Sequence, residues 1–233
     1  MWSTHRSPFA ADGPPGLPDT HPASPGLMGC GEEALTLWAF TNRMQAFLLQ
    51  LRDPSLVEDV TVLLRPTFGR ARMAGPRSVR SEIGRFDAIV TTGGAIYLVD
   101  TRWHRSEDVA DEPMFLGQTQ RRRHRAFREY LSQWRDRGPS DWRDFEAALT
   151  PAFEEKDLGV RPAPAGSHLA RNLEFVLRRC SEADLPVEDV LLLVVPRGWA
   201  RMPRPPDGYR LVLLEYEPID GSDYVVLNPP GRP

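Results

Sequence analysis

The segment SEIGRFDAIVTTGGAIYLVDTRWHR, residues 81–105, decides the fold. Two runs of β-branched and aromatic residues flank Gly93 and Gly94, and a Gly-Gly pair between such runs predicts a β-hairpin. A two-residue primed turn needs or tolerates positive φ at both central positions, which glycine adopts readily. With the two glycines as the loop, Thr92 faces Ala95, and the register of the whole hairpin follows.

In that register Asp87 faces Asp100, and directly opposed side chains share one face of the sheet. Arg102 lies two residues after Asp100 and therefore shares the same face. Two like charges placed opposite each other repel unless a proton or a cation lies between them. The hydrophobic residues Ile89 and Leu98 on this face favour a partly desolvated acid pair, whose cost a bound metal would relieve. The alternative is that a bulge turns one acid to the other face and that both are solvated.

The order of these residues resembles the PD-(D/E)xK superfamily of restriction-endonuclease-like nucleases. The sequence segments FDAIV, GG and IYLVDTR are most similar to those of its nuclease-related-domain (NERD-like) branch, in which the second strand usually ends Glu-Thr-Lys. Here Asp100 stands for the Glu, Thr101 matches, and Arg102 replaces the Lys. The resemblance implies a Mg²⁺ or Mn²⁺ site formed by Asp87, Asp100 and the Thr101 carbonyl. It covers about residues 31–134.

Composition is that of an ordinary globular chain. The 233 residues are 41% hydrophobic and 26% charged, with a formal net charge of -3, which argues against bulk avidity for nucleic acid. Two cysteines exclude a disulfide framework. The sequence has neither a run long enough to cross a bilayer nor the apolar stretch of a secretory signal, so we expect a cytoplasmic protein without a membrane partner.

The N-terminal part predicts a tail followed by a helix. Residues 1–28 are rich in Pro and Gly and predict a disordered tail, so that residues 29–233 form a single domain. From Glu32, apolar residues recur at steps of three and four up to Leu51, which predicts one amphipathic helix. Counting back from Leu37 puts Glu33 on the buried face and Glu32 one step off it. Glu33 either complements the helix dipole or, as the resemblance implies, belongs to the site.

Two arginine-rich segments are candidates for binding nucleic acid. Residues 65–80 contain no acid, and the arginine fork suits phosphate, so this loop either tracks a nucleic-acid backbone or is a solvated linker. In residues 116–134, Gln120 and His124 lie on the apolar face of a predicted helix, and Gln120 is the candidate that the resemblance places at the site. We take His124 as a hydrogen-bonded core residue. The nucleic-acid-binding candidates are Arg70, Arg72, Arg77, Arg121, Arg122 and Arg125.

The rest of the chain completes an α/β domain. Two further helices are predicted at 141–155 and 168–180, and the continuous apolar run DVLLLVVP predicts a central strand covered on both faces. We expect a restriction-endonuclease-like core, a central mixed sheet flanked by helices in the order α-β-β-β-α-β. A helical insertion and extra C-terminal strands complete it.

Three functions are compatible with these patterns. The first is a Mg²⁺-dependent nuclease acting on nucleic acid, DNA in particular, with Asp87, Asp100, Arg102, Glu33 and Gln120 as catalytic residues. Arginine stays protonated, so Arg102 is expected to clamp charge and to weaken catalysis relative to Lys. The second is a catalytically inactive nucleic-acid-binding module. The third is a protein-interaction module with solvated acids.

Overall fold

A five-stranded mixed sheet forms the centre of the computed structural model, which describes residues 27–68, 84–103, 117–138, 141–199, 203–222 and 224–227. The strands lie in the order β2 (Thr61–Leu64), β5 (Ala88–Thr91), β6 (Ile96–Trp103), β7 (Val187–Pro196) and β8 (Tyr209–Tyr216). β5 pairs antiparallel with both β2 and β6, whereas β7 pairs parallel with both β6 and β8. The expected α/β class, a mixed sheet flanked by helices, is confirmed.

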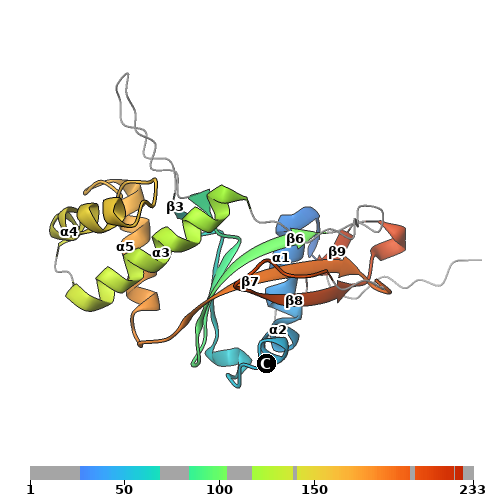
Figure 1. The fold of residues 1–233 in the computed structure, drawn as a ribbon. Helices are drawn as coiled ribbons and strands as arrows, with labels where there is room; N and C mark the ends of the chain where they lie inside the picture. Colours follow the sequence, from blue (N-terminus) through green and yellow to red (C-terminus); the bar gives the residue numbers. More distant parts are fainter. Residues whose placement is uncertain are drawn as a thin grey trace, which may run out of the picture.

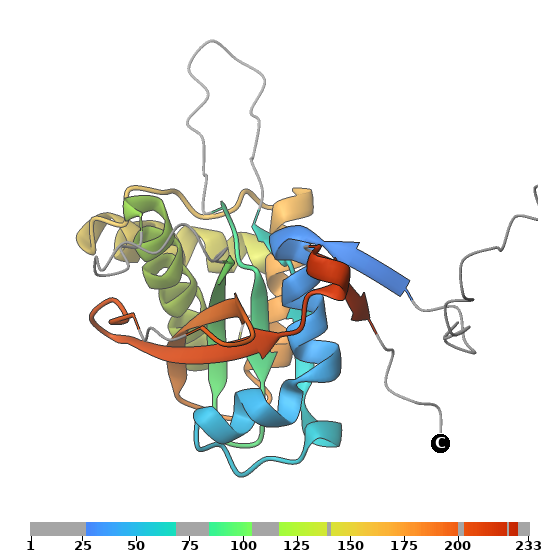
Figure 2. The same cartoon turned by 90° about the vertical axis from the view of Figure 1, so that its right-hand side faces the viewer.

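Helices cover both faces of this sheet (Figures 1 and 2). α1 (Gly31–Asn42) and α2 (Met44–Gln50) lie on one face, and α3 (Gln118–Arg137), α4 (Trp142–Glu155) and α5 (His168–Cys180) form a group on the other. Two small ribbons complete the fold, β1 (Leu27–Cys30) with β9 (Tyr224–Leu227), and β3 (Thr67–Phe68) with β4 (Gly84–Arg85). Two short 3₁₀ turns occur at Val57–Asp59 and Ile219–Gly221. No helix among the described residues has the length and apolar character required to cross a membrane.

The alternation along β6 separates two hydrophobic cores. Ile96 and Leu98 join the core under α3, α4 and α5, whereas Tyr97 and Val99 join the core under α1 and α2. β7 lies between β6 and β8 and is buried from residue 190 to residue 195. The central position predicted from its apolar run is therefore confirmed.

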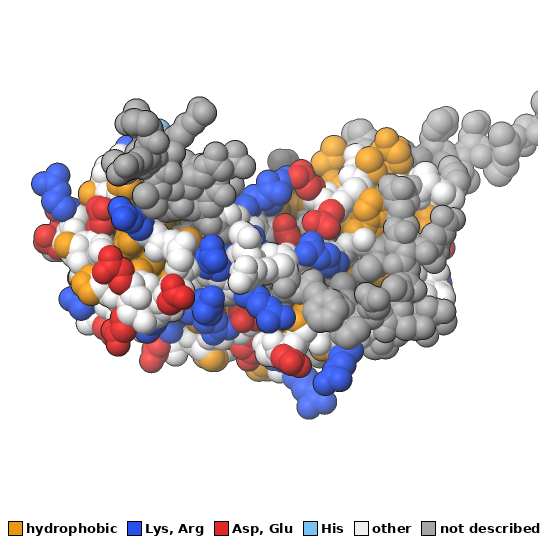
Figure 3. All heavy atoms as spheres, turned by 45° about the horizontal axis from the view of Figure 1, so that its top comes forward, with side chains coloured by type: hydrophobic (Ala, Val, Ile, Leu, Met, Phe, Trp, Pro, Cys, Tyr) orange, Lys and Arg blue, Asp and Glu red, His pale blue; other side chains and the backbone are white. Residues whose placement is uncertain are grey.

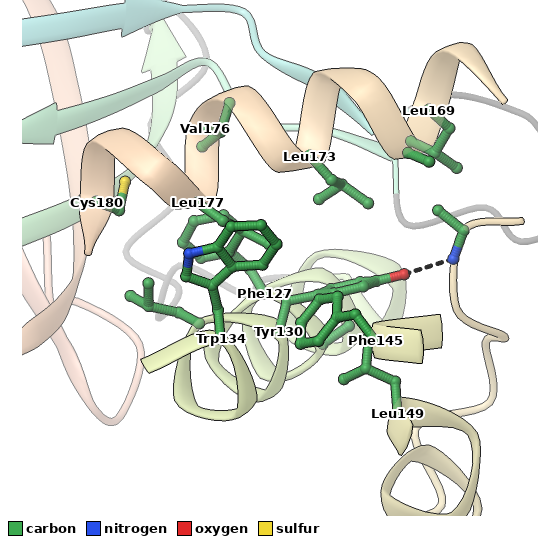
Figure 4. Close-up of a cluster of buried hydrophobic side chains, with 14 of the residues drawn as sticks. Phe127, Tyr130, Trp134, Phe145, Leu149, Leu169, Leu173, Val176, Leu177 and Cys180 are labelled. Carbon is green, nitrogen blue, oxygen red and sulfur yellow. Dashed lines mark hydrogen bonds between the residues drawn. The ribbon is translucent and has the colours of Figure 1, made fainter. Parts of the chain in front are cut away.

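Aromatic rings dominate the core between α3, α4 and α5 (Figure 4). Tyr130 and Trp134 on α3 pack edge-on or tilted against Phe145 of α4. The Tyr130 hydroxyl accepts a 2.7 Å hydrogen bond from the backbone N–H of Ala163, which anchors the α4–α5 connection. The helices predicted here begin as expected, with Asp141 and Ser167 accepting backbone N–H bonds as N-caps.

Two expectations for the N-terminal part were wrong. The helix predicted to run on to Leu51 is interrupted at Arg43, where φ is -130°. Thr41 Oγ1 bonds back to the Leu37 carbonyl at 2.9 Å and also to Asn42, and such side-chain bonds compete with a continuous helix. The last two residues of the predicted tail, at 27 and 28, belong to β1, which pairs with β9.

The hairpin register is confirmed, but its turn differs from the expected one. Ala88 pairs with Val99, as predicted, and each following pair keeps that register. Neither turn glycine has a φ in the left-handed region. Instead, Thr92 Oγ1 accepts the N–H groups of Gly94 and Ala95, and Asp53 accepts the Thr92 hydroxyl at 2.7 Å. Side-chain hydrogen bonds therefore hold the turn.

Candidate functional site

A bulge separates the two aspartates that the hairpin was expected to bring face to face. The backbone N–H of Asp87 donates to the carbonyl of Val99, the residue already paired with Ala88. Two residues of one strand thus oppose one of the other, which reverses the alternation at that point. Phe86 then packs in the α3 core, and the Asp87 side chain lies on the α1 side. The expectation of a shared face was therefore wrong.

Asp100 is fully buried on the α3 side and is held by two cationic groups. Arg123 forms an ion pair with its Oδ1, and His124 Nε2 lies 2.9 Å from its Oδ2. The other ring nitrogen of His124 lies 2.8 Å from Asp189, which also pairs with Arg128 at 2.8 Å. Burial disfavours the charged imidazole, but the hydrogen bonds to Asp100 and Asp189 outweigh it and raise the pKa of His124.

Asp87 and Glu32 form an acidic group on the opposite face of the sheet from Asp100, the face covered by α1. Asp87 Oδ2 accepts the backbone N–H of Thr101 at 2.7 Å, and Glu32 accepts that of Trp103, so both carboxylates are held along β6. Burial raises the pKa of Asp87, and the negative charge of Asp100 adds to the effect. Burial followed by the charge of Asp87 raises the pKa of Glu32. Both acids line a cavity of about 540 Å³.

The exposed ion pairs at the mouth of this cavity correct one candidate. Glu33 was placed on the buried face of the helix, but its side chain is 66% exposed and pairs with Arg65 and Arg85. Glu32 takes the inward position instead. The reason is the phase of the helix, because Leu35 and Trp38 define its buried face whereas Leu37 is only half-buried.

Arg102 meets Gln120, which the resemblance suggested for the site, on the α3 side. Arg102 Nη2 donates to Gln120 Oε1 at 3.1 Å, and the same oxygen accepts the N–H of Gly117 at the start of α3. Arg102 shares the face of Asp100, but the ion pair with Asp100 is made by Arg123. The guanidinium of Arg102 is half-buried near the acidic group, and its charge offsets part of the rise in the pKa of Glu32 that burial and Asp87 cause.

The arginine candidates divide into three sets. Arg70, Arg72 and Arg77 lie outside the described residues. Arg122 faces the α4–α5 connection at Gly159. Arg121 and Arg125 are exposed on α3 and line a different cavity, together with Arg128. In Figure 3, Lys and Arg side chains gather across the middle of one face, interleaved with carboxylates.

Sequence reasoning did not identify Arg123, Asp189 or Glu32 as members of the site. Arg123 adjoins the apolar stripe of α3, and Asp189 stands at the beginning of the run that forms β7, where an acid beside a buried strand was a usable signal. Glu32 was named but placed off the buried face. Each of them contacts the site through a side chain whose direction depends on helix phase or on strand pairing.

A divalent cation fits only part of this arrangement. Within the described ranges, no group of three Asp, Glu, His or Cys side chains is disposed to hold a metal ion. Magnesium retains several waters and often binds through one or two carboxylates. Glu32 and Asp87 provide two such groups, and the buried Thr101 hydroxyl beside them has no hydrogen-bond partner among the described residues. Both oxygens of Asp100 are already bonded to cationic side chains, so Asp100 does not fit as a ligand in this state.

Comparisons with protein-family models, with curated proteins and with solved structures found no match.

Proposed function

We propose that this protein is a metal-dependent nuclease of the PD-(D/E)xK kind, which hydrolyses phosphodiester bonds in nucleic acid, DNA in particular. The observation that carries the proposal is the convergence of Glu32 and Asp87 on backbone N–H groups of β6, beside Asp100. Three carboxylates, of Glu32 on α1, Asp87 directly before β5 and Asp100 on β6, thus lie near one another where β5 begins and β6 ends. Acids with raised pKa values concentrate at functional sites more often than elsewhere.

The arrangement of the elements supports the same proposal. α1, β2, β5, β6, α3 and β7 follow one another as helix, three antiparallel strands, helix and parallel strand. Apart from α2 and the short strands β3 and β4, this order is compatible with the restriction-endonuclease-like core that the resemblance implies. α4 and α5 are inserted between α3 and β7, and β8 and β9 extend the fold at its C-terminal end. The acidic group lies at the start of β5 and the end of β6, next to the first turn of α1.

In this proposal each residue of the site has its own role in phosphodiester hydrolysis. Glu32 and Asp87 would hold Mg²⁺ or Mn²⁺, which when bound supplies charge stabilisation for the scissile phosphate and lowers the pKa of a water. Arg102 keeps its positive charge at any working pH, so it orients and neutralises a phosphate oxygen and cannot act as a base. Gln120 holds the Arg102 guanidinium in position through the 3.1 Å bond. Asp100 fixes β6 against α3 through its bonds to Arg123 and His124.

A second function, nucleic-acid binding without hydrolysis, is favoured by one observation. The charge of Asp100 is balanced in the described structure by Arg123 and His124. A nuclease that uses this acid as a metal ligand must first break both contacts. A protein that only binds nucleic acid has no such requirement, and its ion-pair network would be permanent.

Cleavage assays separate the two functions. We expect plasmid DNA or RNA to be cut in millimolar Mg²⁺ or Mn²⁺, and EDTA, Glu32→Gln and Asp87→Asn to abolish cutting. Arg102→Lys should increase cutting, because a compact ammonium with a removable proton restores the acid-x-Lys arrangement, whereas Arg102→Ala should abolish it. Arg137→Gln, at the exposed far end of α3, is the matched control.

Three results would overturn the proposal in whole or in part. Nucleic-acid binding with no cleavage by the wild type or by Arg102→Lys would leave the binding module as the function. Cleavage that continues unchanged in EDTA would remove the metal from the mechanism. Absence of both binding and cleavage would reject both nucleic-acid functions.

A further inference from the structure

A second cavity, of about 430 Å³, lies between the first half of α3 and the beginning of β8. Gln118, Arg121, Arg125 and Arg128 line it from α3, at steps of three and four residues that put them on one side of the helix. Tyr209 closes it from β8. The cavity is distinct from the acidic one, which Glu32 and Asp87 line on the other side of the sheet.

The charges around this cavity leave an excess of positive charge. Asp189, at its wall, is already balanced by Arg128 and by His124, both at 2.8 Å. Arg121 and Arg125 are exposed, and neither forms an ion pair with a carboxylate of the described residues. Asp207 is the remaining acid of the lining and is also exposed. The cavity therefore attracts an anion.

Tyr209, which lines this cavity, carries a buried hydroxyl that has no acceptor among the described residues. The Tyr209 Oη atom is buried and has no hydrogen-bond partner among the described residues, while the Tyr209 ring packs 5.3 Å from the His124 ring. Burial, followed by the charge of Asp189, raises the pKa of Tyr209, so its hydroxyl stays a donor. An unsatisfied buried donor is costly, and an anionic oxygen placed there would accept its hydrogen bond.

We propose that this cavity binds a phosphate group of the nucleic-acid backbone, gripped by Arg121 and Arg125 and by the Tyr209 hydroxyl. Arginine forks match phosphate oxygens and form strong charge-assisted hydrogen bonds. The identity of the ligand as nucleic acid rests on the proposed function, whereas the affinity for phosphate rests on the cavity. His124 lies between this cavity and Asp100, so a phosphate held here is next to the ion-pair network behind the acidic edge.

The experiment uses the full chain in EDTA, so that it is independent of cleavage. Binding of inorganic phosphate is followed by calorimetry, and binding of a labelled single-stranded oligonucleotide by fluorescence anisotropy. We expect Arg121→Gln combined with Arg125→Gln to weaken both about tenfold or more, since each replaced guanidinium removes charge-assisted hydrogen bonds to phosphate. Arg137→Gln removes a charge from the far end of the same helix and should change neither.

Tyr209→Phe distinguishes a ligand-binding role from a structural one. Because the hydroxyl has no partner in the described structure, its removal should leave the thermal stability unchanged or higher, while phosphate affinity falls severalfold. Unchanged affinity in Tyr209→Phe and in the double arginine variant would overturn the cavity as a phosphate site, even for a protein that cleaves DNA. Loss of phosphate binding with unchanged oligonucleotide binding would overturn its assignment to nucleic acid, whatever the cleavage assays show.

Discussion

Asp87 and Asp100 stand on the two arms of one hairpin, yet the structure predicts opposite effects on stability when each is replaced by asparagine. Asp100 is fully buried and its two oxygens bond Arg123 and His124. Asp100→Asn leaves the buried Arg123 without its counter-charge and removes one of the two carboxylates that bond His124. Removing one partner of a buried ion pair costs about 3–5 kcal/mol, a large part of the roughly 5–15 kcal/mol that stabilises a typical domain.

Asp87→Asn should instead leave the free energy of unfolding unchanged or increase it. The pKa of Asp87 is raised in the folded state, by burial first and then by the charge of Asp100. A carboxyl group with a raised folded pKa stabilises the protein fully at low pH, and this contribution is lost as the pH rises through the folded pKa. At neutral pH the ionised Asp87 therefore costs stability, which the neutral amide avoids. The asparagine oxygen can still accept the N–H of Thr101.

Urea unfolding at neutral pH, followed by tryptophan fluorescence and circular dichroism, measures both variants. A lower midpoint with an unchanged m-value for Asp100→Asn would show a change in stability and not in the unfolded state. Asp87→Asn serves as the matched control, since it makes the same chemical change at the same edge. If Asp100→Asn is as stable as the wild type, the ion pairs of Asp100 do not stabilise the fold as argued. If Asp87→Asn is strongly destabilised, the ionised Asp87 does not cost stability as argued.

Two more replacements test the scaffold. Tyr130→Phe should cost about 1–3 kcal/mol in urea unfolding, because the buried N–H of Ala163 loses its acceptor; an unchanged midpoint would contradict this. Burial alone would raise the pKa of Asp53, but hydrogen bonds from Thr92, Ser55 and Tyr97 outweigh burial and lower that pKa. Asp53 therefore stabilises the protein above its unfolded pKa of about 3.9, and this contribution is lost as the pH falls through the folded pKa. Asp53→Asn should therefore destabilise the hairpin turn modestly at pH 7, by about 1 kcal/mol or less because the group is partly exposed, and the difference from wild type should disappear in acid melts; a difference that grows in acid would contradict it.

The register of the β5–β6 hairpin, the central position of β7 and the starts of α4 and α5 followed from local sequence. Two runs of β-branched residues separated by two glycines leave little choice of register, and the pairing of Ala88 with Val99 agrees with it. The run that forms β7 is apolar on both faces, and only a central strand buries both. The caps Asp141 and Ser167 mark helix starts because their side chains satisfy backbone N–H groups that the helix leaves unpaired.

The bulge was the main feature that alternation could not predict. Phe86 and Ile89 are three residues apart, so a regular strand would put them on opposite faces, yet both are buried in the α3 core. An extra residue at Asp87 allows both to pack there, and Phe86 lies against His124 and Phe127. The spacing of the two apolar residues was a signal, but Phe86 could equally have shared the face of Ala88.

Helix phase accounts for the remaining differences. The break at Arg43 shifts the later apolar residues relative to α1, so a periodicity read across the break misplaces the first turn, and Glu33 was chosen over Glu32. On α3, Arg123 and His124 are neighbours at the border of the buried stripe. Long side chains at such a border can reach inward or outward, and the presence of buried Asp100 favours the inward direction for Arg123.

The bulge gives the two aspartates different tasks. On the α3 side, Asp100 is paired with Arg123 and His124 of α3, which makes it part of the packing between β6 and α3. On the α1 side, Asp87 and Glu32 retain raised pKa values that no cationic side chain fully offsets, so their stability cost is available to be relieved by a bound cation. A replacement of Arg102 by Lys keeps the positive charge near Glu32 but exchanges the guanidinium for a compact ammonium, and it leaves the contacts of Asp100 in place. In this fold the residues that hold the sheet together and the residues that would perform chemistry are therefore separate, although one hairpin carries most of both.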